Sequence, residues 1–172
     1  MRVFVAVEVT DTKVVDSIKR FQSGTHIDAR PVIPENLHIT LQFLGEVADT
    51  PQVIGALRGV RFEAFDITLK GVGTFPESGQ PRIVWIGIGG DCLSDLAKSV
   101  EEALAPLGFC RDEPFVPHLT VFRVKKKAED VRDKLGGMES VSFGVQHVTQ
   151  IKLKAGEPDP GSAYSDLWES ET

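Results

Sequence analysis

Apolar runs separated by turn residues divide the start of the chain into a strand and a helix. The segment RVFVAVEV (2–9) is apolar and rich in β-branched residues, which predicts a buried strand. Asp11 stands where the N-cap of a following helix is expected. That helix carries apolar residues at i, i+4 and i+7, as an amphipathic helix does: Val14, Ile18 and Phe21.

Extended segments flank a second predicted helix. Residues 27–33, 37–45 (LHITLQFLG) and 65–73 (FDITLKGVG) have the composition of strands or extended chain. Between the last two, Thr50 and Pro51 are typical of an N-cap followed by proline at the first helical position. We expect this helix to pack through Val53, Ile54 and Leu57.

The same order of elements begins again at Arg82, which lies 80 residues after Arg2 (82 − 2). Segment 82–88 (RIVWIGI) predicts another buried strand, and Asp91 is the expected cap of a helix. The apolar face of that helix comprises Leu93, Leu96, Ala97, Val100, Leu104 and Leu107. The remaining predicted elements are a strand at 115–124, a helix with Ala128, Val131 and Leu135 ended by Gly136-Gly137, and strands at 141–145 and 148–154.

A β-α-β-α-β order that occurs twice predicts a mixed α/β (α+β) fold with two pseudo-symmetric lobes. We expect a single domain over residues 1–172, with repeats of about 1–78 and 79–172. Equivalent residues of two such lobes can face each other across a cleft. Only the last few residues, WESET, have a composition that suggests disorder.

The composition restricts the partners and the cellular setting. A net charge of −6 argues against a long electrostatic contact with a nucleic-acid duplex, although one phosphate could still be bound. Two cysteines are too few for a disulfide framework and favour a reducing cytoplasm. The apolar N-terminal run is only of strand length, and no apolar run reaches membrane-spanning length. We therefore expect no membrane partner, and a monomer.

The pattern His-x-Thr occurs twice at the repeat offset, at His38 and Thr40 and again at His118 and Thr120. Because alternate side chains of a strand share a face, each strand presents an imidazole beside a hydroxyl group. Strict alternation adds Gln42 to the face of His38 and sends Ile39, Leu41 and Phe43 into the core.

Two imidazoles and two hydroxyl groups around one cleft suit the cleavage of a phosphodiester. Histidine titrates near neutral pH, so one ring can act as a base while the other acts as an acid. Hydroxyl groups can donate to a phosphoryl group as its charge redistributes. In-line attack needs the base and the acid on opposite sides of phosphorus, which two lobes can supply without a metal ion.

The other histidines fit this pattern less well. Composition alone predicts about 0.2 His-x-Thr triplets, and a lone histidine in a strand is usually structural. A third triplet begins at His147, but it lacks the repeat relation, so we expect it to be accidental. His26 is expected on the surface.

The sequences around the two triplets resemble a known family. HITL and HLTV, together with PENLH, FPESGQPRIVW and PHLTVFRVK, are similar to the two-histidine phosphoesterase superfamily, and most of all to its RNA 2',3'-cyclic phosphodiesterase or 2'-5' RNA ligase family. The resemblance extends over nearly the whole chain. It implies antiparallel sheets that line a central cleft, and hydrolysis of an RNA 2',3'-cyclic phosphate end to a 2'-phosphate with no metal or other cofactor.

The resemblance also implies roles for individual residues. His38 would donate a proton to the leaving O3', and His118 would be the base that activates water. Thr40 and Thr120 would bind the phosphate. The opposite assignment of acid and base remains open, because a pseudo-symmetric site could run in either direction.

Other positions are less well defined by the resemblance. Arg123 matches an arginine that similar proteins place near the substrate phosphate, but strict alternation puts it on the face opposite His118. It can contact substrate only if the strand twists, bulges or ends by Phe122. Phe43 and Tyr164 could each stack on a base, although for Phe43 packing in the core is favoured over stacking. The loop AGEPDPGSAY differs from the serine- and threonine-containing loop of similar proteins, so its substrate contacts stay open.

Alternative functions remain. A 2'-5' RNA ligase that joins tRNA halves, or a phosphoesterase for a small cyclic nucleotide, would share the same acid–base site. A non-catalytic module that binds RNA ends is disfavoured, because binding alone does not need two titrating groups. Metal-dependent hydrolysis is disfavoured because no His, Asp and Glu cluster has ligand spacing.

Overall fold

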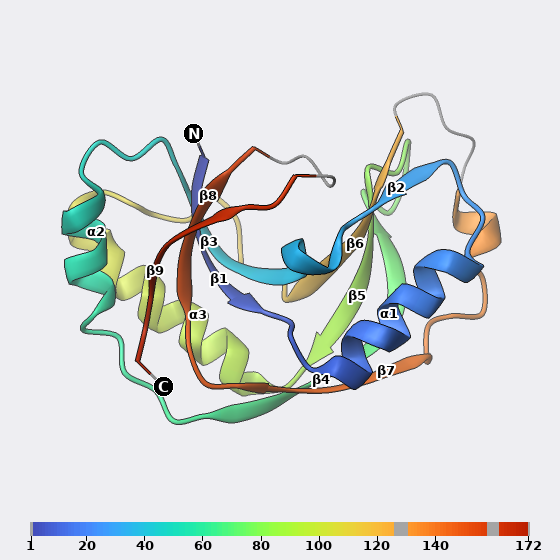
Figure 1. The fold of residues 1–172 in the computed structure, drawn as a ribbon. Helices are drawn as coiled ribbons and strands as arrows, with labels where there is room; N and C mark the ends of the chain where they lie inside the picture. Colours follow the sequence, from blue (N-terminus) through green and yellow to red (C-terminus); the bar gives the residue numbers. More distant parts are fainter. Residues whose placement is uncertain (1, 126–130, 158–161, 172) are drawn as a thin grey trace.

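Two antiparallel sheets with helices on their outer sides make up the fold (Figure 1). The computed structural model describes residues 2–125, 131–157 and 162–171. The strands are β1 (Arg2–Glu8), β2 (Ala29–Pro31), β3 (His38–Gly45), β4 (Phe65–Phe75), β5 (Ile83–Gly89), β6 (His118–Val124), β7 (Ser142–Val148), β8 (Lys152–Gly156) and β9 (Ser165–Glu169). The helices are α1 (Thr12–Gly24), α2 (Thr50–Leu57) and α3 (Asp91–Leu104), with 3₁₀ turns at Pro34–Asn36, Ala105–Leu107 and Val131–Lys134.

Both halves of the chain contribute strands to each sheet. Sheet A has the order β3-β1-β8-β9, and sheet B has the order β2-β6-β5-β4-β7. The helices cross over as well, since α1 packs against β6 and β7 of sheet B and α3 packs against β3 of sheet A. The mixed α+β fold with antiparallel sheets is therefore as predicted, but the two sheets do not correspond to residues 1–78 and 79–172.

The exchange of strands has a physical reason. A sheet made only of β3 and β1 would leave one side of β1 with unpaired backbone groups, and β8 from the second half supplies the missing partner. In sheet B, β4 from the first half pairs with β5 in the same way. The strand order β3-β1-β8-β9 of sheet A corresponds to the order β6-β5-β4-β7 of sheet B. The two sheets therefore still reflect the repeat, although each contains strands from both halves of the chain.

The apolar faces of α1 and α3 are buried as predicted. The buried residues are Val14, Ile18 and Phe21 in α1, and Leu93, Leu96, Ala97, Val100 and Leu104 in α3. Leu107, also predicted on the face of the third helix, lies beyond its end in a 3₁₀ turn and is only partly buried. Together with the apolar residues of the strands they form a core between each sheet and its helices. Among the described residues, no helix is long and apolar enough to cross a membrane.

Two of the three predicted helix caps were wrong by one residue. Asp11 does cap α1, where its carboxylate accepts hydrogen bonds from the backbone N–H groups of residues 13 and 14 at 3.0 and 3.1 Å. In α2 the cap is Asp49 rather than Thr50, because the Asp49 carboxylate reaches the N–H of Gln52 at 3.1 Å. In α3 the cap position is Gly90, and Asp91 is the first helical residue.

The C-terminal third differs most from the prediction. The expected helix at 128–135 lies partly outside the described residues, and its described part, Val131–Lys134, is a 3₁₀ turn. Strand β9 includes Trp168 and Glu169, so the expectation of disorder for WESET was wrong for these two residues. They are ordered because β9 pairs with β8, where Trp168 lies opposite Leu153.

Candidate active site

A pocket of about 220 Å³ lies between β3 of sheet A and β6 of sheet B, and it brings the predicted residues together. Its lining includes both His-x-Thr pairs and Arg123. The complete lining is Arg2, Phe4, His38, Thr40, Phe43, His118, Thr120, Arg123, Gly156 and Tyr164.

A shift of register in β3 decides which side chains reach this pocket. Thr40 lies opposite Ala6 of β1, but Gln42 lies opposite Val5, so one extra residue, Leu41, is accommodated between them. The shift reverses the alternation after Thr40. Gln42 is 3% exposed and donates a hydrogen bond to the carbonyl of residue 109 at 3.3 Å, whereas Phe43 is 72% exposed and lines the pocket. The predictions for Gln42 and Phe43 were wrong for this reason.

The same irregularity occurs in β6, 80 residues later. Thr120 lies opposite Trp85 and Phe122 lies opposite Val84, which leaves Val121 as the extra residue. As a result Phe122 is buried and Arg123 lines the same pocket as His118. The condition that the sequence set for Arg123, a bulge by Phe122, is met. Phe43 and Arg123 therefore occupy equivalent positions on the two strands.

Both imidazoles are held by a backbone carbonyl two residues earlier. His38 Nδ1 lies 2.7 Å from the carbonyl oxygen of Asn36, and His118 Nδ1 lies 2.8 Å from that of Val116. Because a carbonyl oxygen only accepts, each Nδ1 must carry the proton, which leaves Nε2 as the atom that exchanges protons. His38 Nε2 lies 3.0 Å from Thr40 Oγ1, whereas His118 Nε2 has no partner among the described residues.

Asn36 is a site residue that the sequence did not single out. Its side chain is 3% exposed, donates to the carbonyl of Ser162 at 2.6 Å and accepts from the N–H of Tyr164 at 3.1 Å. Asn36 thus ties the segment that carries Tyr164 to the turn that orients His38. The asparagine of the PENLH segment was visible in the sequence, but its partners lie 126 and 128 residues away.

Aromatic rings surround His38. The ring of Phe4 lies 4.9 Å from the imidazole, and the ring of Tyr164 meets it edge-on at 5.4 Å. Tyr164 fits because Gly156 has no side chain, since a Cβ there would lie 2.6 Å from Cδ1 of the tyrosine. On the other sheet, Phe75 meets His118 edge-on at 5.2 Å.

A cluster of charges lies beside His38 on sheet A. Glu8 is directly opposite His38 in the ladder of β1 and β3, so the two side chains share a face. Lys154 is 3% exposed, and its Nζ lies 2.9 Å from Glu8 Oε2 and 2.6 Å from Asp166 Oδ1. Lys152 bridges the same two carboxylates at 2.6 and 2.9 Å.

These surroundings favour the neutral form of His38. The pKa of His38 is lowered to about 4, chiefly by burial and to a smaller extent by the positive charges of Lys154 and Arg123. The hydrogen bond to Asn36 and the negative charge of Glu8 act in the opposite direction.

The remaining histidines lie outside the pocket. His147 is exposed on β7, and its Nδ1 donates a hydrogen bond to Asp66 Oδ1 at 2.7 Å. His26 is exposed, as predicted. Across the described residues, no group of three or more His, Cys, Asp or Glu side chains is arranged to hold a metal ion.

Sequence comparison identifies the class of protein that the fold and the paired motifs define. The sequence model of one family, the 2'-5' RNA ligase superfamily, matches residues 10–157, so the chain belongs to this superfamily. The resemblance inferred from the motifs is thereby confirmed.

Individual relatives are similar over almost the whole chain. An RNA 2',3'-cyclic phosphodiesterase of Archaeoglobus fulgidus is 45% identical, with 97% of this chain and 98% of the relative covered. One of Methanothermobacter thermautotrophicus is 33% identical, with 97% and 96% covered. Among solved structures, TT0787 of Thermus thermophilus has a TM-score of 0.82 at 28% identity, with 99% and 97% covered. LigT of E. coli complexed with 3'-AMP has a TM-score of 0.76 at 25% identity, with 98% and 95% covered.

Proposed function

We propose that the protein is an RNA 2',3'-cyclic phosphodiesterase, which hydrolyses a terminal 2',3'-cyclic phosphate to a 2'-phosphate. The main support is that two imidazoles from opposite sheets, each with Nδ1 bonded to a carbonyl, line one pocket together with two threonines. The names of the relatives support the same substrate.

His38 donates the proton to the leaving O3' and His118 removes a proton from the attacking water. A pKa of about 4 leaves His38 mostly neutral near pH 7 in the free protein. The negative charge of a bound phosphate raises that pKa, because an opposite charge at short range favours the imidazolium form. The substrate thus helps to protonate its own acid, while the more open His118 acts as the base.

The phosphate is bound by Thr40, Thr120 and Arg123. The two hydroxyl groups donate to the non-bridging oxygens from opposite sheets, and the guanidinium of Arg123 balances the negative charge. Both threonines follow their histidine by two residues, so a ligand that reaches one imidazole also reaches its hydroxyl group. The chemistry needs no cofactor in this scheme, since acid, base and charge stabilisation all come from side chains.

A product assay on an oligonucleotide that ends in a 2',3'-cyclic phosphate tests the proposal. We expect a 2'-phosphate end, formed equally well in the presence of EDTA. A joined product would indicate 2'-5' ligation, and binding without turnover would indicate a non-catalytic RNA-end module. His147→Ala serves as the matched control, because its imidazole lies in a His-x-Thr triplet outside the pocket, and it should keep nearly full activity. Loss of activity with EDTA would refute the metal-independent mechanism.

We also propose that the protein is a cytoplasmic monomer without a membrane partner. Cys92 and Cys110 are both free and exposed, which suits a reducing compartment.

A further inference from the structure

Three arginines lie at the Phe43 end of the cleft, and none of them has an acidic partner among the residues that the structure describes. Arg2 of β1 and Arg123 of β6 line the pocket from opposite sheets. Arg30 of β2 lies directly opposite Arg123, and residues directly opposite each other in an antiparallel pair project to the same face. Within the described ranges, none of the three side chains forms an ion pair or a hydrogen bond.

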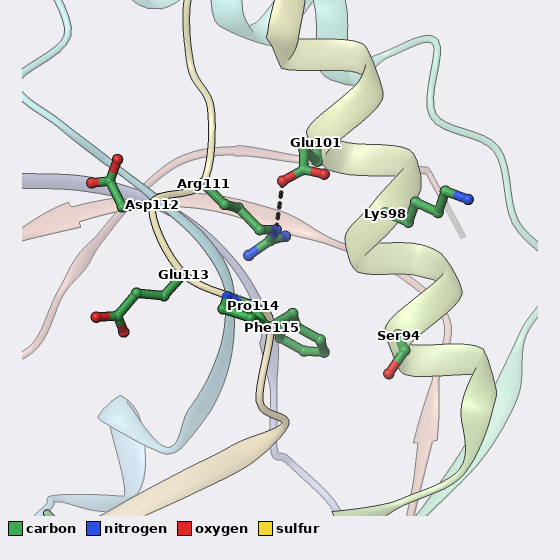
Figure 2. Close-up of a pocket in the computed structure, with 8 residues that line it drawn as sticks. All are labelled: Ser94, Lys98, Glu101, Arg111, Asp112, Glu113, Pro114 and Phe115. Atoms are coloured by element: carbon green, nitrogen blue, oxygen red, sulfur yellow. Dashed lines mark ion pairs between the residues drawn. The ribbon is translucent and has the colours of Figure 1, made fainter.

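Arg111 shows how an arginine is neutralised elsewhere in the molecule (Figure 2). Its Nε lies 3.1 Å from Glu101 Oε2, and its guanidinium donates to the carbonyl of Ala97 at 3.1 Å and lies 5.3 Å from the ring centre of Phe115. Arg30 and Arg123 have the opposite arrangement, because like charges directly across a ladder repel each other. A bound anion would relieve that repulsion.

An exposed aromatic ring accompanies these cations. Phe43 is 72% exposed, and it stands on β3 at the position equivalent to Arg123 on β6. A flat ring beside arginines is the combination that binds single-stranded nucleic acid, since bases stack on the ring and phosphates pair with the cations. This cluster has the opposite sign to the net charge of −6.

We propose that this end of the cleft binds the RNA chain that precedes the terminal nucleotide. Arg2 and Arg30 hold its phosphodiester groups, and Phe43 stacks on one of its bases. Arg30 does not line the pocket itself, so we assign it to a phosphate outside the pocket rather than to the terminal cyclic phosphate. The proposal builds on the phosphodiesterase function and specifies its substrate class, an oligonucleotide end rather than a mononucleoside cyclic phosphate.

Kinetics on two substrates test this subsite. We expect the wild type to have a higher kcat/KM for a tetranucleotide that ends in a 2',3'-cyclic phosphate than for a mononucleoside 2',3'-cyclic phosphate. In Arg2→Gln/Arg30→Gln, this ratio of kcat/KM values should fall by at least about tenfold, mainly through KM for the tetranucleotide. Arg58→Gln, at an exposed arginine outside the cleft, should leave the ratio unchanged. Equal kcat/KM values for the two substrates in the wild type would overturn the proposal.

A binding titration separates this subsite from the proposed reaction. The probe is a labelled tetranucleotide that ends in a 2'-phosphate, titrated at several salt concentrations. Loss of both arginines should lower the slope of log K against log salt by about 1.4, since each phosphate contact to single-stranded nucleic acid contributes about 0.7. An unchanged slope would exclude the subsite. A wild type that turns over neither substrate would refute the phosphodiesterase function alone, because the titration would still decide whether the subsite exists.

Discussion

The two halves of the pocket present the same His-x-Thr pair in different surroundings. On both sheets Nδ1 donates to the carbonyl two residues earlier, at 2.7 Å for His38 and 2.8 Å for His118. On sheet A that carbonyl belongs to Asn36, which is 3% exposed and bonded to the segment that carries Tyr164. On sheet B it belongs to Val116, which is 55% exposed.

The charges differ as well. His38 lies beside the cluster of Glu8, Lys152, Lys154 and Asp166, and its pKa is lowered to about 4, chiefly by burial. His118 has one aromatic neighbour, Phe75, and an Nε2 atom without a partner in the described part of the chain. A repeated motif can thus place two imidazoles in unlike surroundings, and the surroundings of His38, not the motif, lower its pKa.

The largest effects should come from the histidines themselves. His38→Ala and His118→Ala should each lower kcat/KM by about 10² to 10⁴, the usual contribution of one acid or base. A substrate with sulfur in place of O3' distinguishes the two, because a thiolate leaves without a proton. On this substrate His38→Ala should recover most of its loss, and His118→Ala should not.

The reverse result, with recovery in His118→Ala alone, would exchange the roles of acid and base. Recovery in neither variant would mean that leaving-group protonation is not the function of either imidazole.

The sequence predicted the pair of strands but not which residues face the cleft beyond Thr40 and Thr120. Alternation holds from His38 to Thr40 and then fails, because Leu41 and Val121 are extra residues in their ladders. Such a shift depends on the register with a partner strand that is distant in the chain, so a single strand gives no signal of it. The equal spacing of the two shifts, 80 residues (121 − 41), follows from the same repeat as the motifs.

Long-range pairing also explains the other omissions. The faces of α1 and α3 were predicted correctly because helical periodicity is local. Other features depend on residues far away in the chain. They are the exchange of β4 and β8 between the sheets, the formation of strand β9, and the contacts of Asn36 and Lys154. The sequence therefore predicted the two histidines and two threonines of the pocket, but not the neighbours that give His38 and His118 different surroundings.

Asn36→Ala tests whether the side chain of Asn36, which has no counterpart on sheet B, helps to orient His38. The variant removes the hydrogen bond that Asn36 donates to the carbonyl of Ser162 and the one it accepts from the N–H of Tyr164, which should lower the free energy of unfolding by about 1–3 kcal/mol. It should also lower kcat/KM by roughly tenfold, because the turn that orients His38 loosens. Urea unfolding and steady-state kinetics measure the two effects.

Val116→Ala is the matched change on sheet B. It keeps the backbone carbonyl that His118 uses and removes only an exposed side chain, so both quantities should stay close to the wild type. Equal losses in the two variants would show that the two supports do not differ.

Lys154→Met should produce the smallest change, a shift in the titration of His38. Removing the positive charge favours the imidazolium form, so the pKa should rise from about 4 by on the order of one unit. Glu8 acts in the same direction once Lys154 no longer offsets its charge, while Lys152 still pairs with both carboxylates and preserves the fold. NMR titration of the His38 ring, assigned by comparison with His38→Ala, measures the shift.

The limb of the kcat/KM profile near pH 4 should move to higher pH together with this pKa, because the pH dependence of kcat/KM reports groups of the free enzyme. Lys154→Arg, which keeps the charge, should leave the pKa and the limb unchanged. An unshifted pKa in Lys154→Met would mean that the charge of Lys154 does not contribute to the lowered pKa of His38.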